Sequence, residues 1–210
     1  MVAYTAKDSG IWTEMLIEDT SRNKCNLIIE TTLRNKNVAT KTVEKLFNRG
    51  YDIHAKIFVV SFDKSLLGSY ARYEVLKAER GTGRFVFDHA LVNTYNGMLE
   101  TVQAVKNQEK CTSIHLYTRE GIFFDGDYRQ TDIVSIIKKE RYREYTQSEI
   151  KFLQQGWKKV NQRMKARCAE KDEYIEIATR MTGRIKMMKE EGVAEKNINV
   201  MNEIYLSDWI

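Results

Sequence analysis

The chain has 210 residues, of which 42% are hydrophobic and 30% charged, and its formal net charge is +5. This length and composition predict a folded protein with one substantial core, and no apolar run approaches the ~18 residues that cross a bilayer. The N-terminus lacks the charged and apolar regions of a signal peptide, so we expect a cytoplasmic protein without membrane association.

The rarer residue types exclude several kinds of site. Cys25, Cys111 and Cys168 are an odd and widely spaced set, which indicates neither a disulfide framework nor zinc binding. The three histidines are equally scattered, so no metal-binding residue is predicted. The excess of basic residues is dispersed along the chain, which argues against a nucleic-acid partner and favours arginines that bind a phosphorylated small molecule.

The first predicted elements are a helix, a buried strand and a second helix. Apolar residues at helical spacing predict a helix from Ile11 to about Lys24. Residues 26–30 contain three consecutive branched aliphatic side chains, which predict a short strand buried on both faces. A helix with Asn37 as N-cap follows, and Gly50 is expected to end it.

The next segments alternate between strands and helices. The pattern predicts a strand over residues 52–60, helices over 64–80 and 89–108, and strands over 113–117 and 122–124 joined by a turn at 119–121. Strands separated by helices imply right-handed crossovers and a mostly parallel sheet. The sequence therefore predicts an α/β fold.

From about residue 130 onward the chain is predicted to be helical. Apolar residues at steps of three and four form narrow seams over residues 150–164 and 174–188. Neither seam lasts the ~3–4 heptads that a coiled coil needs. We expect two helices folded against each other or against the sheet.

Polar side chains follow the predicted 26–30 strand where it would leave the core. Glu30, Thr32 and Arg34 offer an acceptor, a hydroxyl and a fixed cation. Open α/β sheets bind their ligands outside the carboxyl ends of the strands, which makes these residues a candidate site. The alternative is an ordinary exit from a strand with an ion pair.

Several spaced motifs accompany these residues. The run Asn-Leu-Ile-Ile-Glu-x-Thr-Leu-Arg, then Gly50-Tyr51, Ser65, Arg72-Tyr73-Glu74 and Gly83-Arg84 resembles the zeta toxin family over about residues 1–125. The resemblance implies a three-layer P-loop-kinase-like fold, here with an incomplete sheet. It also implies a bacterial toxin that phosphorylates UDP-N-acetylglucosamine with ATP and Mg²⁺ and blocks cell-wall synthesis. It divides the chain into a kinase core over residues 1–128, with substrate-binding and lid parts, and a helical region over 129–210 packed on that core.

The resemblance assigns the substrate-binding residues one by one. Glu30 and Thr32 match the Glu-x-Thr that holds the amino sugar, and Arg34 matches the arginine that follows it. Glu14 matches a glutamate of the preceding helix that lines the sugar site. Thr31 departs from the pattern, because the family more often has glycine there.

Two arginines match those that contact the nucleotide phosphates in the family. They are Arg72, in Arg-Tyr-Glu, and Arg84, after the glycines. Arginines fixed around a moving phosphoryl group are worth ~10³ to 10⁵ in rate when well placed. The alternative for Arg72 is a surface arginine paired to Glu74 or Glu79.

One departure concerns the phosphate-binding loop. A P-loop kinase needs Gly-x-x-x-x-Gly-Lys-[Ser/Thr], and the only glycines here at that spacing, Gly121 and Gly126, are followed by Asp127. In the family this loop and the catalytic aspartate precede the segment that matches Met1, so no catalytic residue is identifiable. We expect Met1 to be an internal start or the product of a truncated gene model; the rival is a short protein that closes the gap with its C-terminal helices or a partner.

Two functions remain open on the sequence alone. In the first, the chain is the part of a zeta-toxin-like UDP-N-acetylglucosamine kinase that carries the substrate-binding residues and the arginines. This part would be inactive alone, and its partner would be a small helical antitoxin. ATP and Mg²⁺ belong to the full-length family, and the missing loop argues against their binding by this chain. The alternative is a non-catalytic remnant that binds a helical partner through residues 146–210.

Overall fold

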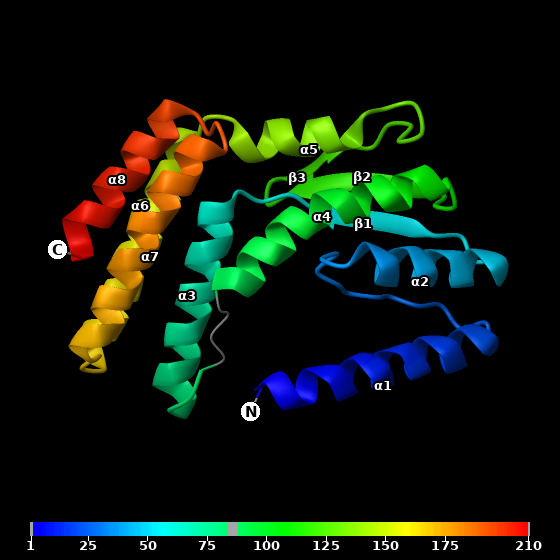
Figure 1. The fold of residues 1–210 in the computed structure, drawn as a ribbon, viewed down its shortest axis with the longest axis horizontal. Helices are drawn as coiled ribbons and strands as arrows, with labels where there is room; N and C mark the ends of the chain where they lie inside the picture. Colours follow the sequence, from blue (N-terminus) through cyan, green and yellow to red (C-terminus); the bar gives the residue numbers. More distant parts are fainter. Residues whose placement is uncertain (1, 84–87, 210) are drawn as a thin grey trace. The chain divides into compact units, whose positions relative to one another are not determined.

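The computed structural model describes residues 2–83 and 88–209, and it confirms an α/β chain with a helical C-terminal region (Figure 1). The elements, in chain order, are α1 (Val2–Arg22), α2 (Lys36–Asn48), β1 (His54–Phe58), α3 (Phe62–Arg80), α4 (Asp88–Gln108), β2 (Ser113–Thr118), β3 (Gly121–Phe124), α5 (Ile133–Tyr142), α6 (Gln147–Ala166), α7 (Lys171–Glu190) and α8 (Glu195–Trp209).

The chain forms two compact units. Unit 1 contains α1, α2, β3 and most of α4, and unit 2 contains α3 and α5 to α8. Strands β1 and β2 begin in unit 1 and end in unit 2. The bounds are Met1–Ile57, Asn93–His115 and Ile122–Thr131 for unit 1, and Phe58–Val92, Leu116–Gly121 and Asp132–Ile210 for unit 2.

The three strands form one sheet in the order β1-β2-β3. The amide of Thr112 donates to the carbonyl of Ile53 at 2.8 Å, and the amide of Val59 donates to that of Tyr117 at 2.7 Å. Hydrogen-bonded partners therefore advance together along β1 and β2, as parallel strands require. A two-residue turn, with the predicted 119–121 location, reverses the chain into β3. The carboxyl ends of β1 and β2 consequently lie at the same edge of the sheet.

The strand expected over residues 26–30 does not form. Residues 25–35 have no regular secondary structure, and no strand among the described residues pairs with them. Leu27 and Ile29 are half-buried, whereas the side chain of Ile28 is fully exposed at 101%. An extended backbone points successive side chains to opposite sides, and only one side of this segment is covered. The prediction of a strand buried on both faces was therefore wrong.

The caps of α2 explain where that helix begins and ends. The side chain of Asn35, two residues before the predicted N-cap, accepts hydrogen bonds from the amides of Asn37 at 3.0 Å and Val38 at 3.4 Å. Two of the otherwise unpaired amides of the first turn are thereby satisfied. Gly50 follows the helix with φ +76°, a left-handed conformation that glycine adopts without steric cost, as predicted.

Unit 2 has its core between α3 and the C-terminal helices. The predicted seam of α6 is completely internal: Ile150, Leu153, Trp157, Val160 and Met164 are all buried. Helix α6 contacts α3 and α8, and α7 contacts α8, so α8 lies beside both α6 and α7 (Figure 1).

Aromatic rings join these helices at the centre of the core. The ring of Trp157 lies 5.4 Å from that of Tyr70 on α3 and 5.8 Å from that of Tyr205 on α8, measured between centroids. Such tilted and edge-on pairs add to the stabilisation that burial provides. Both predicted helices form, with α6 packed on α3 and α8 and α7 on α8, and the predicted seam of α6 is not an open surface.

The contact between α6 and α3 requires a glycine. A Cβ atom on Gly156 would lie 2.4 Å from Cδ2 and 3.2 Å from Cγ of Leu67, a buried side chain. Alanine usually stabilises a helix interior relative to glycine by about 0.5–1 kcal/mol. Overpacking a core costs about 1–3 kcal/mol, so the steric clash with Leu67 outweighs the gain in helix propensity.

We therefore expect Gly156→Ala to lower the free energy of unfolding by about 1–2 kcal/mol, net of the helix propensity gained. Gly183→Ala is the matched control, because Gly183 lies within α7 with no atom within 4 Å of the added Cβ, and it should raise stability by about 0.5–1 kcal/mol. Urea unfolding followed by far-UV circular dichroism measures both. A Gly156→Ala protein as stable as Gly183→Ala would contradict the close contact.

Candidate functional site

The predicted sugar-binding residues lie on an open loop of unit 1. Glu30, Thr32 and Arg34 are exposed, between α1 and α2. Leu33, between Thr32 and Arg34, has φ +53°, a left-handed conformation that costs a branched side chain on the order of 1 kcal/mol. Such strain persists where surrounding contacts impose it. The loop therefore presents the three polar side chains in an irregular backbone conformation.

A glycine of α4 supports this loop. A Cβ atom on Gly97 would lie 2.5 Å from the carbonyl oxygen of Arg34 and 3.4 Å from its Cα. Because the obstacle is backbone, no side-chain rotation could relieve the clash. Only glycine at position 97 therefore allows the backbone of Arg34 to rest against α4.

Glu14, the fourth predicted sugar-binding residue, lies exposed on α1. It lines a shallow depression of about 400 Å³ along this helix, together with apolar Ile11 and Met15. The depression includes none of Glu30, Thr32 and Arg34. Helix α1 is attached to α2 by polar contacts: Glu18 pairs with Lys45 at 2.8 Å and with Arg49.

The predicted phosphate-binding residue Arg72 is exposed on α3 in unit 2. Its side chain makes no ion pair with any residue that the structure describes. Glu74 does not pair with it, because the Glu74 carboxylate is buried and bound by Arg167 at 2.7 and 2.9 Å. The structure thus removes Glu74 as the partner in the alternative interpretation of Arg72. Arg84, the second predicted phosphate-binding residue, lies outside the described residues.

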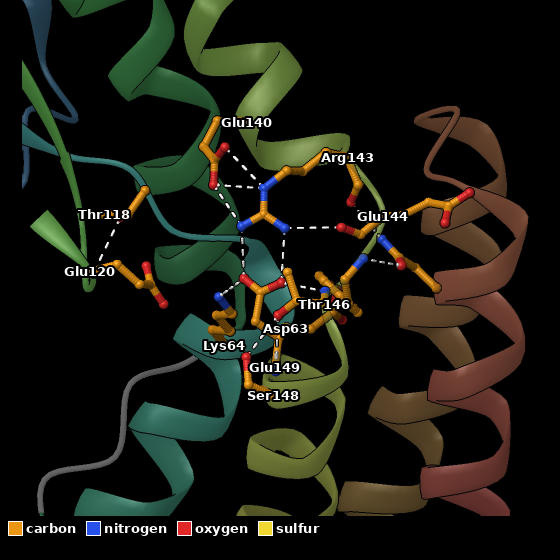
Figure 2. A network of polar contacts seen from close by, with 12 residues as sticks. Asp63, Lys64, Thr118, Glu120, Glu140, Arg143, Glu144, Thr146, Ser148 and Glu149 are labelled. Carbon is orange, nitrogen blue, oxygen red and sulfur yellow. Dashed lines mark hydrogen bonds and ion pairs between the residues drawn. The ribbon is translucent and has the colours of Figure 1, made fainter. Parts of the chain in front are cut away.

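A polar cluster gathers at the carboxyl edge of β1 and β2 within unit 2 (Figure 2). Glu149 on α6 lies at its centre, and its side chain is only 6% exposed. Arg143 donates to both carboxylate oxygens at 2.8 Å, and Lys64 on α3 also pairs with Glu149. The amide of Thr146 completes the set at 2.7 Å as part of the α6 capping box.

These contacts fix the ionisation of Glu149. Burial alone would raise the pKa of its carboxyl group, but hydrogen bonds from Arg143, Lys64 and the Thr146 amide outweigh burial and lower the pKa to about 2. Arg143 is itself fixed by Glu140, whose carboxylate lies 2.9–3.0 Å from Nε. The cluster is therefore charged and mutually neutralised at neutral pH.

A second buried group lies beside this cluster. Asp63, at the start of α3, is bound by Arg184 of α7 at 3.0 and 3.3 Å and by the hydroxyl of Tyr145 at 2.8 Å. Burial raises the pKa of Tyr145, so its hydroxyl stays protonated and acts as a donor to Asp63. The start of α3 is thus joined to α7 and to the α5–α6 connection.

The cavity at this edge is small. It has a volume of about 10 Å³, the space of about one water molecule. Its lining includes charges of both signs that already pair with one another. The lining residues are Val59, Val60, Ser61, Lys64, Thr118, Arg119, Glu120, Glu140, Arg143, Tyr145 and Glu149.

The described residues do not fit a magnesium-bound nucleotide triphosphate site of the P-loop type. Gly121 begins β3 and Gly126 follows it, so this pair brackets a strand instead of forming a phosphate-cradling loop. No three His, Cys, Asp or Glu side chains gather as a metal site in the described ranges. Of the two predicted phosphate-binding arginines, the described part of the chain contains Arg72, and it contains no metal-binding set.

Comparison with protein-family models identifies the family of this chain. Residues 1–131 match the model described as zeta toxin, which is more than half of the chain. The chain belongs to the zeta toxin family. The match confirms the family inferred from the spaced motifs, and it contains Glu14, Glu30, Thr32, Arg34, Arg72 and Arg84.

Named relatives of this zeta toxin family member are themselves toxins. It is 26% identical to toxin PezT of Streptococcus pneumoniae serotype 4 over 174 residues, which covers 77% of this chain and 64% of PezT. It is 28% identical to toxin zeta of Enterococcus hirae and to that of Streptococcus pyogenes, each over 145 residues, covering 67% of this chain and 48% of each toxin. The chain thus spans about two thirds to one half of the relatives' length.

A solved structure has a similar fold. It comes from the molecular and structural characterisation of the PezAT chromosomal toxin–antitoxin system of the human pathogen Streptococcus pneumoniae. The TM-score is 0.67 at 26% identity, and the match covers 78% of this chain and 65% of the other.

Sequence reasoning missed the residues that contact the Arg34 backbone and that pair with charged side chains of α3. Gly97 had a signal, because a glycine inside a helix costs about 1 kcal/mol relative to alanine and indicates a close contact. The Glu149 cluster also had a sequence signal, since Thr146 and Glu149 have the spacing of a capping box at the start of a helix. Arg167 had none, because its partner Glu74 is distant in the sequence.

The Glu149 cluster predicts a loss of stability at acid pH. A carboxyl group with a lowered pKa stabilises the fold fully above its unfolded pKa, near 4.5, and this contribution disappears as the pH falls toward 2. We expect Glu149→Gln to be less stable than the natural protein at pH 7 by about 2–3 kcal/mol, because two cations lose their partner. This difference should shrink steadily between pH 4.5 and pH 2.

Urea unfolding at a series of pH values measures the difference. Glu203→Gln is the control, since Glu203 is exposed on α8, and it should follow the natural protein within about 0.5 kcal/mol throughout. A Glu149→Gln deficit that stays constant from pH 7 to pH 2 would show that the ionised carboxylate is not the stabilising group.

Proposed function

We propose that the chain carries the sugar-nucleotide-binding part of a zeta toxin that phosphorylates UDP-N-acetylglucosamine. The observation that carries the proposal is the family match over residues 1–131, which contains the Glu-x-Thr-x-Arg run on an exposed loop. Glu30 would accept hydrogen bonds from sugar hydroxyls, Thr32 would donate or accept one, and Arg34 would bind phosphate oxygens. Glu14 would line the sugar side of the site.

The proposal limits what this chain does alone. ATP is the phosphate donor of the proposed reaction and Mg²⁺ its metal cofactor, and the described residues offer Arg72 but neither a phosphate-cradling loop nor a metal-binding set. We infer that the chain binds substrate and transfers no phosphate by itself. The proposed setting is the cytoplasm, with a small antitoxin as protein partner. Among the described helices, none combines the length and hydropathy that crossing a bilayer requires.

An interaction module built on residues 146–210 is less well supported. That hypothesis needed open apolar seams on the C-terminal helices. The seam residues of α6 are buried inside unit 2, and Met181 and Met188 of α7 are buried as well. The α6 seam therefore offers no apolar surface to a partner, and the α7 seam is left with the half-buried side chains of Tyr174, Ala178 and Ile185.

Isothermal titration with UDP-N-acetylglucosamine tests the proposed function. The natural chain should bind with measurable heat, and Glu30→Ala and Arg34→Ala should each weaken binding by ~10-fold or more. A hydrogen bond to a charged group contributes about 1.5–3 kcal/mol, which corresponds to that loss. Asp125→Ala removes an exposed carboxylate elsewhere in unit 1 and should bind as the natural chain does. A natural chain that gives no heat, or a Glu30→Ala chain that binds normally, would contradict the proposal.

A further inference from the structure

Helix α3 is held along one face by two buried carboxylates. Asp63 and Glu74 each have a side chain only 1% exposed. They are eleven residues apart, which at 100° per residue places them within about 20° of each other around the helix axis. Both therefore point into the same side of unit 2, where α6 and α7 lie.

An arginine from the C-terminal region fixes each carboxylate. Arg184 of α7 binds Asp63 and is itself held by Glu191 at 2.8 Å. Arg167, which caps the C-terminus of α6, donates through Nε and Nη2 to the two oxygens of Glu74 at 2.7 and 2.9 Å. A two-point contact of this kind fixes direction as well as distance.

Arg167 is rigidly placed in turn. Glu173, in the first turn of α7, accepts from its Nη1 at 2.8 Å and from its Nη2 at 2.6 Å. Arg167 thus links the end of α6, the start of α7 and the middle of α3. The side chains of Arg167 and Glu173 are 17% and 30% exposed, so water reaches the outer pair more than the inner one.

Arg72 lies on the other side of α3. It is nine residues from Asp63, which corresponds to about 180° around the helix. The burial of Glu74 and the exposure of Arg72 are consequently two results of the same helix rotation. If Glu74 turned outward to reach water, Arg72 would turn by the same angle.

We propose that Arg167 is a positioning residue for Arg72: by holding Glu74 inside unit 2, it sets the rotation of α3 that presents Arg72 to a polyphosphate ligand. This inference rests on the proposed function and on the phosphate-binding role that the family resemblance implies for Arg72. Arg167 lies beyond residues 1–131, so the family match does not assign it a role. The inference gives the C-terminal helices a role in placing an arginine that is expected to contact phosphate.

The physical reason is the burial of Glu74. Without Arg167, an ionised Glu74 would be buried with no counter-charge, which folded proteins avoid by moving the group toward water or by protonating it. Movement of Glu74 toward water would change the rotation of α3. A displacement of about 1 Å is enough to spoil a directional contact between a guanidinium and a phosphate.

The test uses the full chain and inorganic triphosphate without metal, titrated calorimetrically at low salt. We expect Arg72→Gln to abolish binding and Arg167→Gln to weaken it by ~10-fold, the effect of one poorly aligned charge-assisted contact. Arg163→Gln is the matched control: it removes the same charge from an exposed position one turn earlier on α6 and should leave binding within ~2-fold. Arg167→Lys, which keeps the charge and loses the two-point contact, should be intermediate.

A second comparison separates positioning from direct contact with the ligand. In a Glu74→Gln background no charge is left buried, so Arg167→Gln should cost little further affinity for triphosphate. If Arg167→Gln costs the same ~10-fold in that background, Arg167 acts on the ligand itself and the inference is wrong. The same follows if Arg167→Gln binds as the natural chain does, or if the natural chain binds no triphosphate.

UDP-N-acetylglucosamine distinguishes this inference from the proposed function. Its affinity should be the same for Arg167→Gln and the natural chain, because Glu30, Thr32 and Arg34 belong to unit 1. A parallel loss of both ligands in Arg167→Gln would indicate general unfolding and overturn the positioning role. Absence of sugar-nucleotide binding together with normal triphosphate results would count against the proposed function alone.

Discussion

Three carboxylates of unit 2, Asp63, Glu74 and Glu149, are almost completely buried, and each is bound by an arginine from residues 132–210. Taking a carboxylate out of water costs several kcal/mol, and only a close and well-aligned partner offsets this cost. The arrangement of α3, α6 and α7 therefore depends on these contacts being formed together. Apolar packing, centred on Trp157, supplies cohesion between the same helices, and the ion pairs determine their register.

Unit 1 is organised differently. Its helices α1 and α2 meet through exposed or half-exposed ion pairs around Glu18, and such pairs contribute little individually. Apolar side chains of α1 face outward, with Trp12 73% exposed. The loop that carries Glu30 and Arg34 gains its support from a backbone contact with Gly97. The proposed substrate-binding segment is thus less constrained than the proposed phosphate-binding helix.

Most elements could be predicted from local sequence, because the signals that define them are local. The apolar spacing of α6 and the glycine after α2 acted as predicted. The strand over residues 26–30 could not be judged in this way, since a strand depends on a neighbour whose presence no local pattern reveals. Residue types and spacing identified the family, and with it Glu30 and Arg72 as site candidates. The ion pairs that orient α3 join residues about 90 to 120 positions apart, which a single sequence does not connect.

The contact between Glu74 and Arg167 also constrains how this sequence can change over time. A substitution at position 167 alone leaves a buried negative charge, and one at position 74 alone removes the inner of the two carboxylates that hold Arg167. Either single step costs stability, whereas a joint replacement by an apolar or oppositely ordered pair avoids the intermediate charge. Among homologues that keep this helical region, positions 74 and 167 should therefore vary as a pair, even though one lies inside the zeta toxin match and the other outside it.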